Sequence, residues 1–363
     1  MLRAAKLVAL RLARDSGLTS LWIRTPWRRN RLLILSYHGI SLSDEHEWNP
    51  ALYMKPSLLA RRLELVRKSG CTVLPLEAAI RRLYEGDLPP RSVAITVDDG
   101  TYDFYREGFP IFQSFSFPVT VYLTTYYAGF NRPVYDTMSS YLLWKGRGRT
   151  FQWPEVFGTT DAIALSDAGC RFAKQRLRSY PIERQLSGAG KDELLRQMAE
   201  LLDVDYSEIL ARRLLHIMNL AEAQELAARG VDFQLHTHRH GVSFDRGIFE
   251  REIADNREWM KRVRAGDLRH FCYPGGVYRQ EFLPWLREWK MVSATTCEAG
   301  VASRGSEPLL LPRLVDTSLL TEDEFTGWLS GIAAFLPRRR YIEAEGQFLE
   351  HRLGIQTAAP HAP

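Results

Sequence analysis

Short apolar runs alternate along this chain with longer stretches in which apolar residues recur at helical spacing. The short runs predict strands because they are rich in β-branched residues and are bounded by Gly, Pro or charged residues. The strands expected on this basis cover residues 32–37, 71–74, 93–97, 118–124, 231–235, 270–273, 291–296 and 309–315. The helices expected around them cover residues 2–14, 55–69, 76–84, 109–115, 220–229, 249–263 and 280–289. Alternation of this kind favours parallel strands with right-handed crossovers.

The alternation lapses between about residues 127 and 216, a stretch that holds Trp144, Trp153 and two helix-like runs. It is too long for a connecting loop, so we expect a mainly helical insertion in one crossover. The 363 residues do not require two domains, because a single α/β barrel commonly has about 250 residues before insertions. We expect a basic N-terminal extension at 1–31, a barrel at 32–332 and a peripheral tail at 333–363.

Several predicted strands end in polar side chains that can carry chemistry. Asp98 and Asp99 follow the strand at 93–97, and His236 and His240 follow the strand at 231–235. The carboxyl ends of parallel barrel strands meet on one face, where active sites are built. One aspartate with two histidines, leaving positions open, suits a catalytic divalent metal. Neighbouring side chains leave a strand in opposite directions, so the second aspartate can stay free beside it.

Simpler structural roles for these residues are also open. Asp98 and Asp99 alone could form a turn with a helix cap. His38, at the end of the strand at 32–37, could be a hydrogen-bonded core residue. The His236 and His240 spacing also occurs in zinc proteases, but those have a glutamate directly after the first histidine. Thr237 stands there in this chain, which excludes that catalytic class.

The chain resembles the polysaccharide deacetylases, carbohydrate esterase family 4, in several motifs that occur in the family's order. Thr96-Val-Asp98-Asp99-Gly100 and His236-Thr-His-Arg-His240 resemble its first two motifs, and Phe271-Cys-Tyr-Pro-Gly-Gly276 resembles its proline motif. The last is in the form seen in the exopolysaccharide-linked branch. Further similarity to that branch lies at Tyr37-His-Gly-Ile40, Ala294-Thr-Thr296 and Leu311-Pro-Arg-Leu314. The resemblance implies an incomplete (β/α)7-8 barrel of the polysaccharide deacetylase type with a mainly helical insertion.

The resemblance also implies roles for individual residues. Asp99, His236 and His240 would hold the metal, with Zn²⁺ expected and Co²⁺ or Ni²⁺ as alternatives. Asp98 would be the general base, and the backbone N–H of Gly275 would stabilise the oxyanion.

Two family features are missing from the sequence. Cys272 occupies the position of an arginine that braces the base, and residues 309–315 contain Arg313 but no histidine, so the motif that supplies the family's general acid is missing. Another group must then protonate the leaving amine. His38 is the first candidate for this role and His238 is the second.

The function implied is a metal-dependent hydrolase that removes N-acetyl groups from an amino-sugar polysaccharide or oligosaccharide, in exopolysaccharide biosynthesis. Two alternatives remain open on the sequence. One is a non-catalytic, glycan-binding barrel in a polysaccharide assembly system, motivated by the two missing features. The other is a deacetylase of O-acetyl esters or non-sugar amides.

The net charge of +5 is concentrated near the start of the chain. Residues 1–31 contain eight basic residues and one acidic residue: Arg3, Lys6, Arg11, Arg14, Arg24, Arg28, Arg29 and Arg31 against Asp15. A basic end favours an anionic membrane surface or an acidic polymer as partner, and no motif for nucleic acid is present. The helix at 2–14 could pack on the barrel or lie at a membrane interface.

The sequence also gives an expectation about the cell compartment. No apolar run is long enough to span a membrane, and Arg11 and Arg14 interrupt the run that a secretory signal would need. We therefore expect the protein in the cytoplasm or at the inner face of the membrane. The four cysteines are scattered, without a CxxC pair, and are expected to be free thiols: Cys71, Cys170, Cys272 and Cys297.

Overall fold

The computed structural model describes residues 2–264 and 266–336. The predicted tail at 333–363 therefore lies mostly outside the described residues. In the described part, no helix is both long and apolar enough to cross a membrane. The four cysteines are free thiols, as expected.

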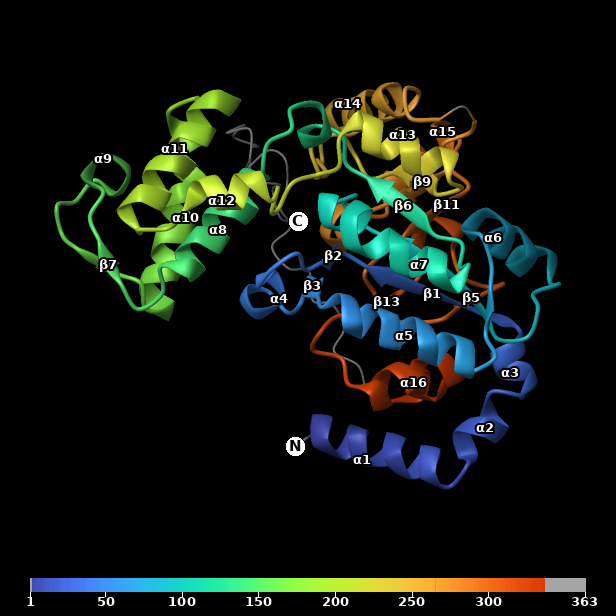
Figure 1. The fold of residues 1–363 in the computed structure, drawn as a ribbon. Coiled ribbons are helices and arrows are strands. Elements are labelled where there is room, and N and C mark those ends of the chain that lie inside the picture. Colours follow the sequence, from blue (N-terminus) through green and yellow to red (C-terminus); the bar gives the residue numbers. More distant parts are fainter. Residues whose placement is uncertain (1, 265, 337–363) are drawn as a thin grey trace, which may run out of the picture.

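A curled sheet of parallel strands forms the centre of the molecule (Figure 1). Its strand order is β11, β10, β9, β6, β5, β1, and each neighbouring pair in this series is parallel. These strands are β1 (Arg31–Tyr37), β5 (Ser92–Val97), β6 (Thr120–Leu123), β9 (Asp232–Leu235), β10 (His270–Cys272) and β11 (Ser293–Thr295). All residues of β5 and β6 are buried, which explains their continuous apolar sequence.

Short strands flank this sheet. β4 (Thr72–Val73) pairs with β5 in parallel, and β12 (Ala302–Ser303) pairs with β1 in antiparallel orientation. β2 (Gly39–Ile40) and β3 (Tyr53–Met54) form a separate parallel pair just after β1.

Residues 311–316 close the sheet between its two ends. The N–H of Leu311 donates to Ala294 O at 2.8 Å, and the N–H of Asp316 donates to Ser36 O at 2.9 Å. The strand predicted at 309–315 is shorter than expected, because only β13 (Leu314–Val315) pairs regularly with β1. Pro308 and Pro312 have no N–H to donate, which limits the ladder. The predicted incomplete α/β barrel is confirmed.

Helices cover the outside of the sheet (Figure 1). They are α5 (Pro56–Lys68), α6 (Leu76–Glu85), α7 (Phe109–Phe115), α13 (Leu220–Ala228), α14 (Arg246–Met260), α15 (Phe282–Glu288) and α16 (Glu322–Ser330). The loop after β2 contains one short helix, α4 (Glu45–Trp48). The buried apolar faces of α5, α7, α13, α14, α15 and α16 join the strands in one large core, whereas that of α6 belongs to a smaller cluster with residues of β1 and β5.

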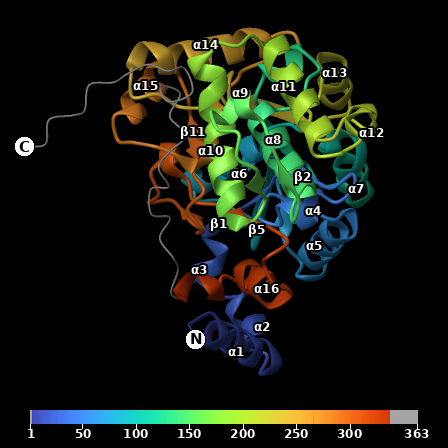
Figure 2. The ribbon, with the colours of Figure 1, turned by 90° about the vertical axis from the view of Figure 1, so that its left-hand side faces the viewer.

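Residues between β6 and α13 form a helical layer with an apolar core of its own. Its elements are α8 (Tyr135–Lys145), β7 (Thr150–Phe151), α9 (Pro154–Phe157), β8 (Ile163–Ala164), α10 (Asp167–Glu183), α11 (Gly188–Leu201) and α12 (Tyr206–Ala211). Trp153 is buried in this core and Trp144 packs at its edge. Seen from the side to which the arrow of β1 points, these helices stand in front of the barrel (Figure 2). The insertion therefore lies on the side where the strands end.

The N-terminal segment forms α1 (Leu2–Asp15), α2 (Leu18–Trp22) and α3 (Pro26–Arg29); in Figure 1, α1 and α2 lie lower than α16, and α3 lies to its right. Leu10 is 2% exposed and packs against Gly327 of α16. Arg11 and Arg14 both form ion pairs with Asp323 at the start of α16. The helix thus packs on the barrel partly through its basic side chains.

Candidate active site and metal centre

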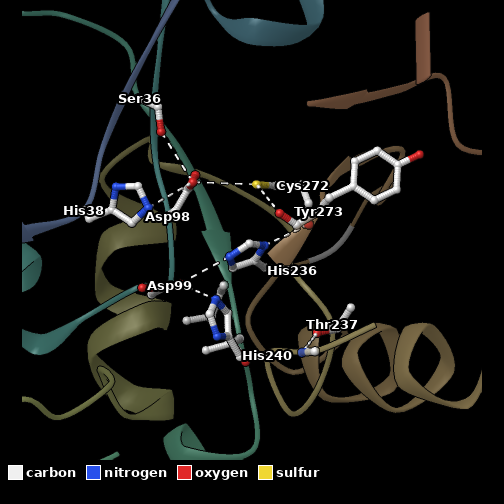
Figure 3. A network of polar contacts seen from close by, with 12 residues as sticks. Ser36, His38, Asp98, Asp99, His236, Thr237, His240, Cys272 and Tyr273 are labelled. Carbon is white, nitrogen blue, oxygen red and sulfur yellow. Dashed lines mark hydrogen bonds and ion pairs between the residues drawn. The ribbon is translucent and has the colours of Figure 1, made fainter. Parts of the chain in front are cut away.

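The turn after β5 separates the two neighbouring carboxylates. The N–H of Asp98 still donates to Tyr37 O at 2.9 Å, whereas Asp99 and Gly100 adopt left-handed backbone conformations, with φ of 69° and 72°. A Cβ at Gly100 would lie 2.2 Å from Leu123 Cδ1, so the turn requires glycine. As a result, Asp98 points into the barrel and Asp99 points toward the histidines (Figure 3).

Asp99, His236 and His240 come together as the sequence predicted. Asp99 Oδ1 lies 3.2 Å from Nε2 of His236 and 3.0 Å from Nε2 of His240 (Figure 3). One donor atom from each residue lies within 4.8 Å of the other two. His236 is almost fully buried, and the other two side chains are partly open to solvent. This leaves room for water and substrate on one side.

The loop after β9 holds the two histidines through a strained backbone. Thr237 and His240 have φ of 61° and 55°, values that residues other than glycine rarely adopt. The Thr237 hydroxyl accepts the N–H of Gly241 at 3.1 Å, and the N–H of His236 donates to Asn256 Oδ1 at 3.0 Å. These bonds fix the loop so that both imidazoles face Asp99.

The donor set fits a divalent cation. His236 Nδ1 lies 2.8 Å from the carbonyl oxygen of Cys272, which can only accept, so Nδ1 carries the proton. In the neutral ring, Nε2 then presents a lone pair to Asp99 Oδ1, and these two atoms repel unless a cation or a proton stands between them. A carboxylate with two imidazoles is a common ligand set for catalytic Zn²⁺.

Asp98 is buried in a network of polar groups from three strands (Figure 3). Its closest partner is Arg313, whose Nη1 and Nη2 each lie 2.8 Å from one carboxylate oxygen. Ser36 Oγ lies 3.3 Å from Oδ2, and His38 Nε2 lies 3.5 Å from it. Burial raises the pKa of Asp98, but the charges of Arg313, His38 and His236, together with the hydrogen bonds from Arg313, outweigh burial and lower the pKa to about 2. Asp98 is therefore a carboxylate at neutral pH.

Arg313 corrects one expectation from the sequence. The arginine that braces the base is missing at Cys272, but Arg313 reaches the same carboxylate from the segment that closes the barrel. Its Nη2 lies 3.2 Å from Cys272 Sγ, so the thiol and the guanidinium fill one buried space. A buried arginine needs a partner of opposite charge. An arginine inside the apolar run 309–315 was therefore the sequence feature that could have indicated a buried ion pair.

A second grouping of donors, Asp98, His236 and Cys272, also lies within 4.8 Å. Both oxygens of Asp98 already accept hydrogen bonds from the Arg313 guanidinium, and the Cys272 thiol contacts the same guanidinium group. We therefore assign the candidate metal centre to Asp99, His236 and His240.

The structure separates the two candidates for the general acid. His38 lies at the end of β1, beside Asp98, with its side chain 15% exposed. His238 has its Nδ1 2.8 Å from Thr125 Oγ1, and its ring meets the edge of Tyr126. Burial and the nearby Arg239 lower the pKa of His238 to about 4, so it is neutral near pH 7 and a poor proton donor. His38 remains the candidate.

Gly275 follows the buried Pro274 in the turn after β10 and has a φ of 62°. In this turn the N–H of Gly276 donates to Tyr273 O at 2.8 Å. The left-handed conformation accounts for glycine at this position. The role of its N–H toward an oxyanion stays a prediction.

Known proteins share this fold. No family model matches the chain. A segment of 101 residues is 32% identical to poly-β-1,6-N-acetyl-D-glucosamine N-deacetylase from Escherichia coli K12. That segment is 27% of this chain and 15% of the relative, so the similarity covers a small part of that enzyme.

Two solved structures align over most of the chain. The deacetylase PplD from Streptococcus pyogenes, in complex with acetate, has a TM-score of 0.53 and 18% identity, and covers 85% of this chain and 99% of its own. IcaB from Ammonifex degensii has a TM-score of 0.51 and 16% identity, and covers 84% and 97%. These likenesses confirm the fold that the motifs implied.

Proposed function

We propose that this chain, which has the fold and the motifs of the polysaccharide deacetylases, hydrolyses N-acetyl groups of an amino-sugar chain. One observation carries the proposal. A carboxylate braced by Arg313 lies beside a three-ligand cation site, at the end of a parallel barrel where substrates bind. A carboxylate held beside an open cation site is what amide hydrolysis by activated water needs.

The side chains would divide the reaction between them. Asp99, His236 and His240 would hold a divalent cation, and such a cation, when bound, would supply a water of lowered pKa and a Lewis acid for the amide carbonyl. Asp98 accepts the proton of the attacking water, and Arg313 keeps both of its oxygens oriented and ionised. The N–H of Gly275 would stabilise the oxyanion that forms when water adds to the carbonyl carbon, and His38 would donate a proton to the amine nitrogen as the C–N bond breaks.

The proposed substrate comes from the name of the relative, and the proposed metal comes from the ligand set. The E. coli relative is named for poly-β-1,6-N-acetyl-D-glucosamine, so a β-linked N-acetylglucosamine chain is the first substrate to test. The two-imidazole, one-carboxylate set favours Zn²⁺, with Co²⁺ or Ni²⁺ as functional replacements.

The alternatives differ in what they need from the site. The non-catalytic barrel was motivated by a missing arginine and a missing histidine, and Arg313 removes the first reason. A deacetylase of O-acetyl esters would use the same base and metal. An alcohol needs much less help from a general acid to leave than an amine does. The loss of kcat on replacing His38 should therefore be larger for an amide substrate than for an ester.

The test measures acetate release from β-1,6-linked N-acetylglucosamine oligomers by metal-stripped protein, with and without added Zn²⁺, Co²⁺ or Ni²⁺. We expect Asp98→Asn to lose roughly 10³-fold in kcat while it still binds metal, and His38→Gln to lose about 10²-fold with the amide and less with an acetyl ester. Asp203→Asn is the matched control, because this carboxylate is 98% exposed on the insertion.

Metal binding is followed by calorimetry, and folding by circular dichroism, for every variant. Activity retained by Asp98→Asn would contradict the role of the base. Tight metal binding without acetate release from any amide or ester would favour the non-catalytic barrel.

A further inference from the structure

An aromatic pair lies beside the loop that carries the metal-binding histidines. The rings of Tyr126 and Phe130 have centroids 5.1 Å apart, and Tyr126 lies 5.6 Å from the His238 ring. Phe130 is 54% exposed, although phenylalanine usually lies in a core. Tyr126 therefore contacts both His238 and Phe130, and Phe130 is the most exposed residue of the three.

Backbone contacts fix these rings relative to the candidate metal centre. The N–H of Tyr126 donates to His238 O at 2.8 Å, and the N–H of Thr124 donates to Asp99 O at 3.3 Å. The loop after β6 is therefore tied to both segments that supply metal ligands. A sugar ring stacked on Phe130 would therefore lie next to the sugar unit that is being deacetylated in the same glycan.

A hollow of about 400 Å³ is lined in part by the same loop, through Ala128, Gly129 and Asn131. Its lining combines the indole of Trp259 and the small or apolar residues of the loop and of α13 with the polar side chains of Asn131, Asn219 and Arg262. Trp259 is 9% exposed and its Nε1 lies close to Gly129. A mixture of one apolar wall and several polar groups fits a sugar, which has an apolar face and a polar rim.

We propose that Phe130, held by the tilted ring of Tyr126, forms a stacking platform for a pyranose ring next to the sugar unit being deacetylated, and that the hollow beside Asn131 and Arg262 receives the following ring. This inference rests on the proposed function and specifies how that site selects a polymer. The apolar face of the ring covers Phe130, and its hydroxyl or acetamido groups meet the donors of the hollow. The enzyme then binds longer chains more tightly than short ones.

The test compares β-1,6-linked N-acetylglucosamine oligomers from the monomer to the pentamer. For the wild type we expect KM to fall as the chain lengthens. For Phe130→Ala we expect KM for the pentamer to rise about five- to tenfold, with the loss growing with chain length, because one aromatic contact is removed. Phe130→Trp keeps an aromatic face and should restore the wild-type KM.

Phe172→Ala is the control, since Phe172 is 48% exposed on α10, away from this loop, and should leave KM unchanged. Zn²⁺ affinity is measured for all variants, because a change there would show damage to the metal loop. Equal KM values for Phe130→Ala and the wild type at every chain length would overturn the platform.

A binding experiment separates this inference from the proposed function. Asp98→Asn protein is titrated with the pentamer, and the dissociation constant is compared with that of Asp98→Asn/Phe130→Ala. If the wild type releases no acetate but Phe130 still governs binding, the platform stands and the hydrolase fails. If acetate is released and Phe130→Ala changes neither KM nor the dissociation constant of the pentamer, the hydrolase stands and the platform fails.

Discussion

Arg313 is the residue on which the candidate base most depends. It is fully buried and donates to both oxygens of Asp98, while its other contacts include Thr296 O at 2.8 Å. Removing one member of a buried pair leaves an unpaired charge, which destabilises a protein by about 3–5 kcal/mol. The sequence shows the arginine but not its partner, because residues 98 and 313 meet only through the closing of the barrel.

Replacing Arg313 tests this dependence. We expect Arg313→Ala to lower kcat about 10²-fold and to lower the free energy of unfolding by about 3 kcal/mol, since Asp98 loses its counter-charge. Arg313→Lys keeps the charge but not the two parallel hydrogen bonds, so its loss of activity should be smaller. Acetate release and urea unfolding measure the two effects.

The neighbouring Cys272 supplies a rescue experiment. Its Sγ lies 3.2 Å from Arg313 Nη2 and 3.6 Å from Asp98 Oδ2, so an arginine at 272 could reach the same carboxylate once residue 313 is small. Cys272→Arg/Arg313→Ala should recover part of the activity lost by Arg313→Ala. Wild-type activity in Arg313→Ala itself would rule out the bracing role.

At the scale of elements, the segment between Asp99 and α7 links the candidate metal centre to β2 of the β2–β3 pair. Asp103 precedes a π-helical turn, Phe104–Gly108. Its Oδ1 accepts the N–H of Ile40 at 2.9 Å and the hydroxyl of Thr101 at 2.6 Å. Burial raises the pKa of Asp103 to about 8, against the effect of these two hydrogen bonds.

This raised pKa predicts a pH dependence of stability. The folded protein keeps the proton of Asp103 up to about pH 8, whereas the unfolded chain releases it near its ordinary pKa of 3.8. The folded state binds more protons between these values, so this residue's contribution is full below about pH 4 and is lost as the pH rises toward 8. We expect Asp103→Asn to show a smaller fall in unfolding free energy across this range than the wild type.

Urea unfolding at several pH values measures this difference, which we expect to be on the order of a few kcal/mol between its two ends. Asp161→Asn, an exposed carboxylate in the insertion, serves as the control. Identical pH profiles for wild type and Asp103→Asn would show that Asp103 has no raised pKa.

At the scale of the whole molecule, the N-terminal helices leave apolar side chains facing solvent. Val8 and Leu12 of α1 are 54% and 64% exposed, and Leu18 and Leu21 of α2 are 48% and 68% exposed. Trp22 and Trp27 pack nearby against the exposed Phe335. Exposed Arg24 and Arg29 lie in the same segment. Leucines and tryptophans beside arginines are typical of a helix that lies on an anionic lipid surface.

We therefore predict that the exposed apolar side chains of α1 and α2 bind to an anionic lipid surface. The double variant Leu12→Gln/Leu21→Gln should bind vesicles that contain an anionic phospholipid several-fold more weakly than the wild type, because two apolar side chains no longer enter the lipid. Cosedimentation with vesicles measures the binding. Neutral vesicles should bind the wild type less well, since the arginines then lack a charged partner.

Leu201→Gln/Leu210→Gln is the matched control, because these leucines are 43% and 39% exposed on the insertion. Deleting the whole segment would be a poor test. Arg28 is fully buried and donates to Leu329 O at 2.9 Å, so the deletion would also remove contacts with the barrel. Equal vesicle binding by the wild type and the Leu12/Leu21 variant would exclude this surface.

Much of this architecture follows from the sequence by itself. Buried parallel strands produce apolar runs that end at polar side chains, and Asp98, Asp99, His236 and His240 stand at such ends. The left-handed turn at Gly100 and the four-residue histidine spacing are local features of the chain. Local spacing and strand direction therefore brought one aspartate and two histidines together as candidate metal ligands, and the family resemblance chose Asp99 over Asp98.

The tertiary structure alone decided the rest. The pairing of Arg313 with Asp98, the neutral state of His238 beside Thr125, and the outward direction of Leu12 each depend on contacts between distant segments. No local periodicity encodes such contacts, because a side chain's partner and burial are set by the packing of the whole barrel. The sequence determined which groups the site contains, and the closing of the barrel determined which of them act on one another.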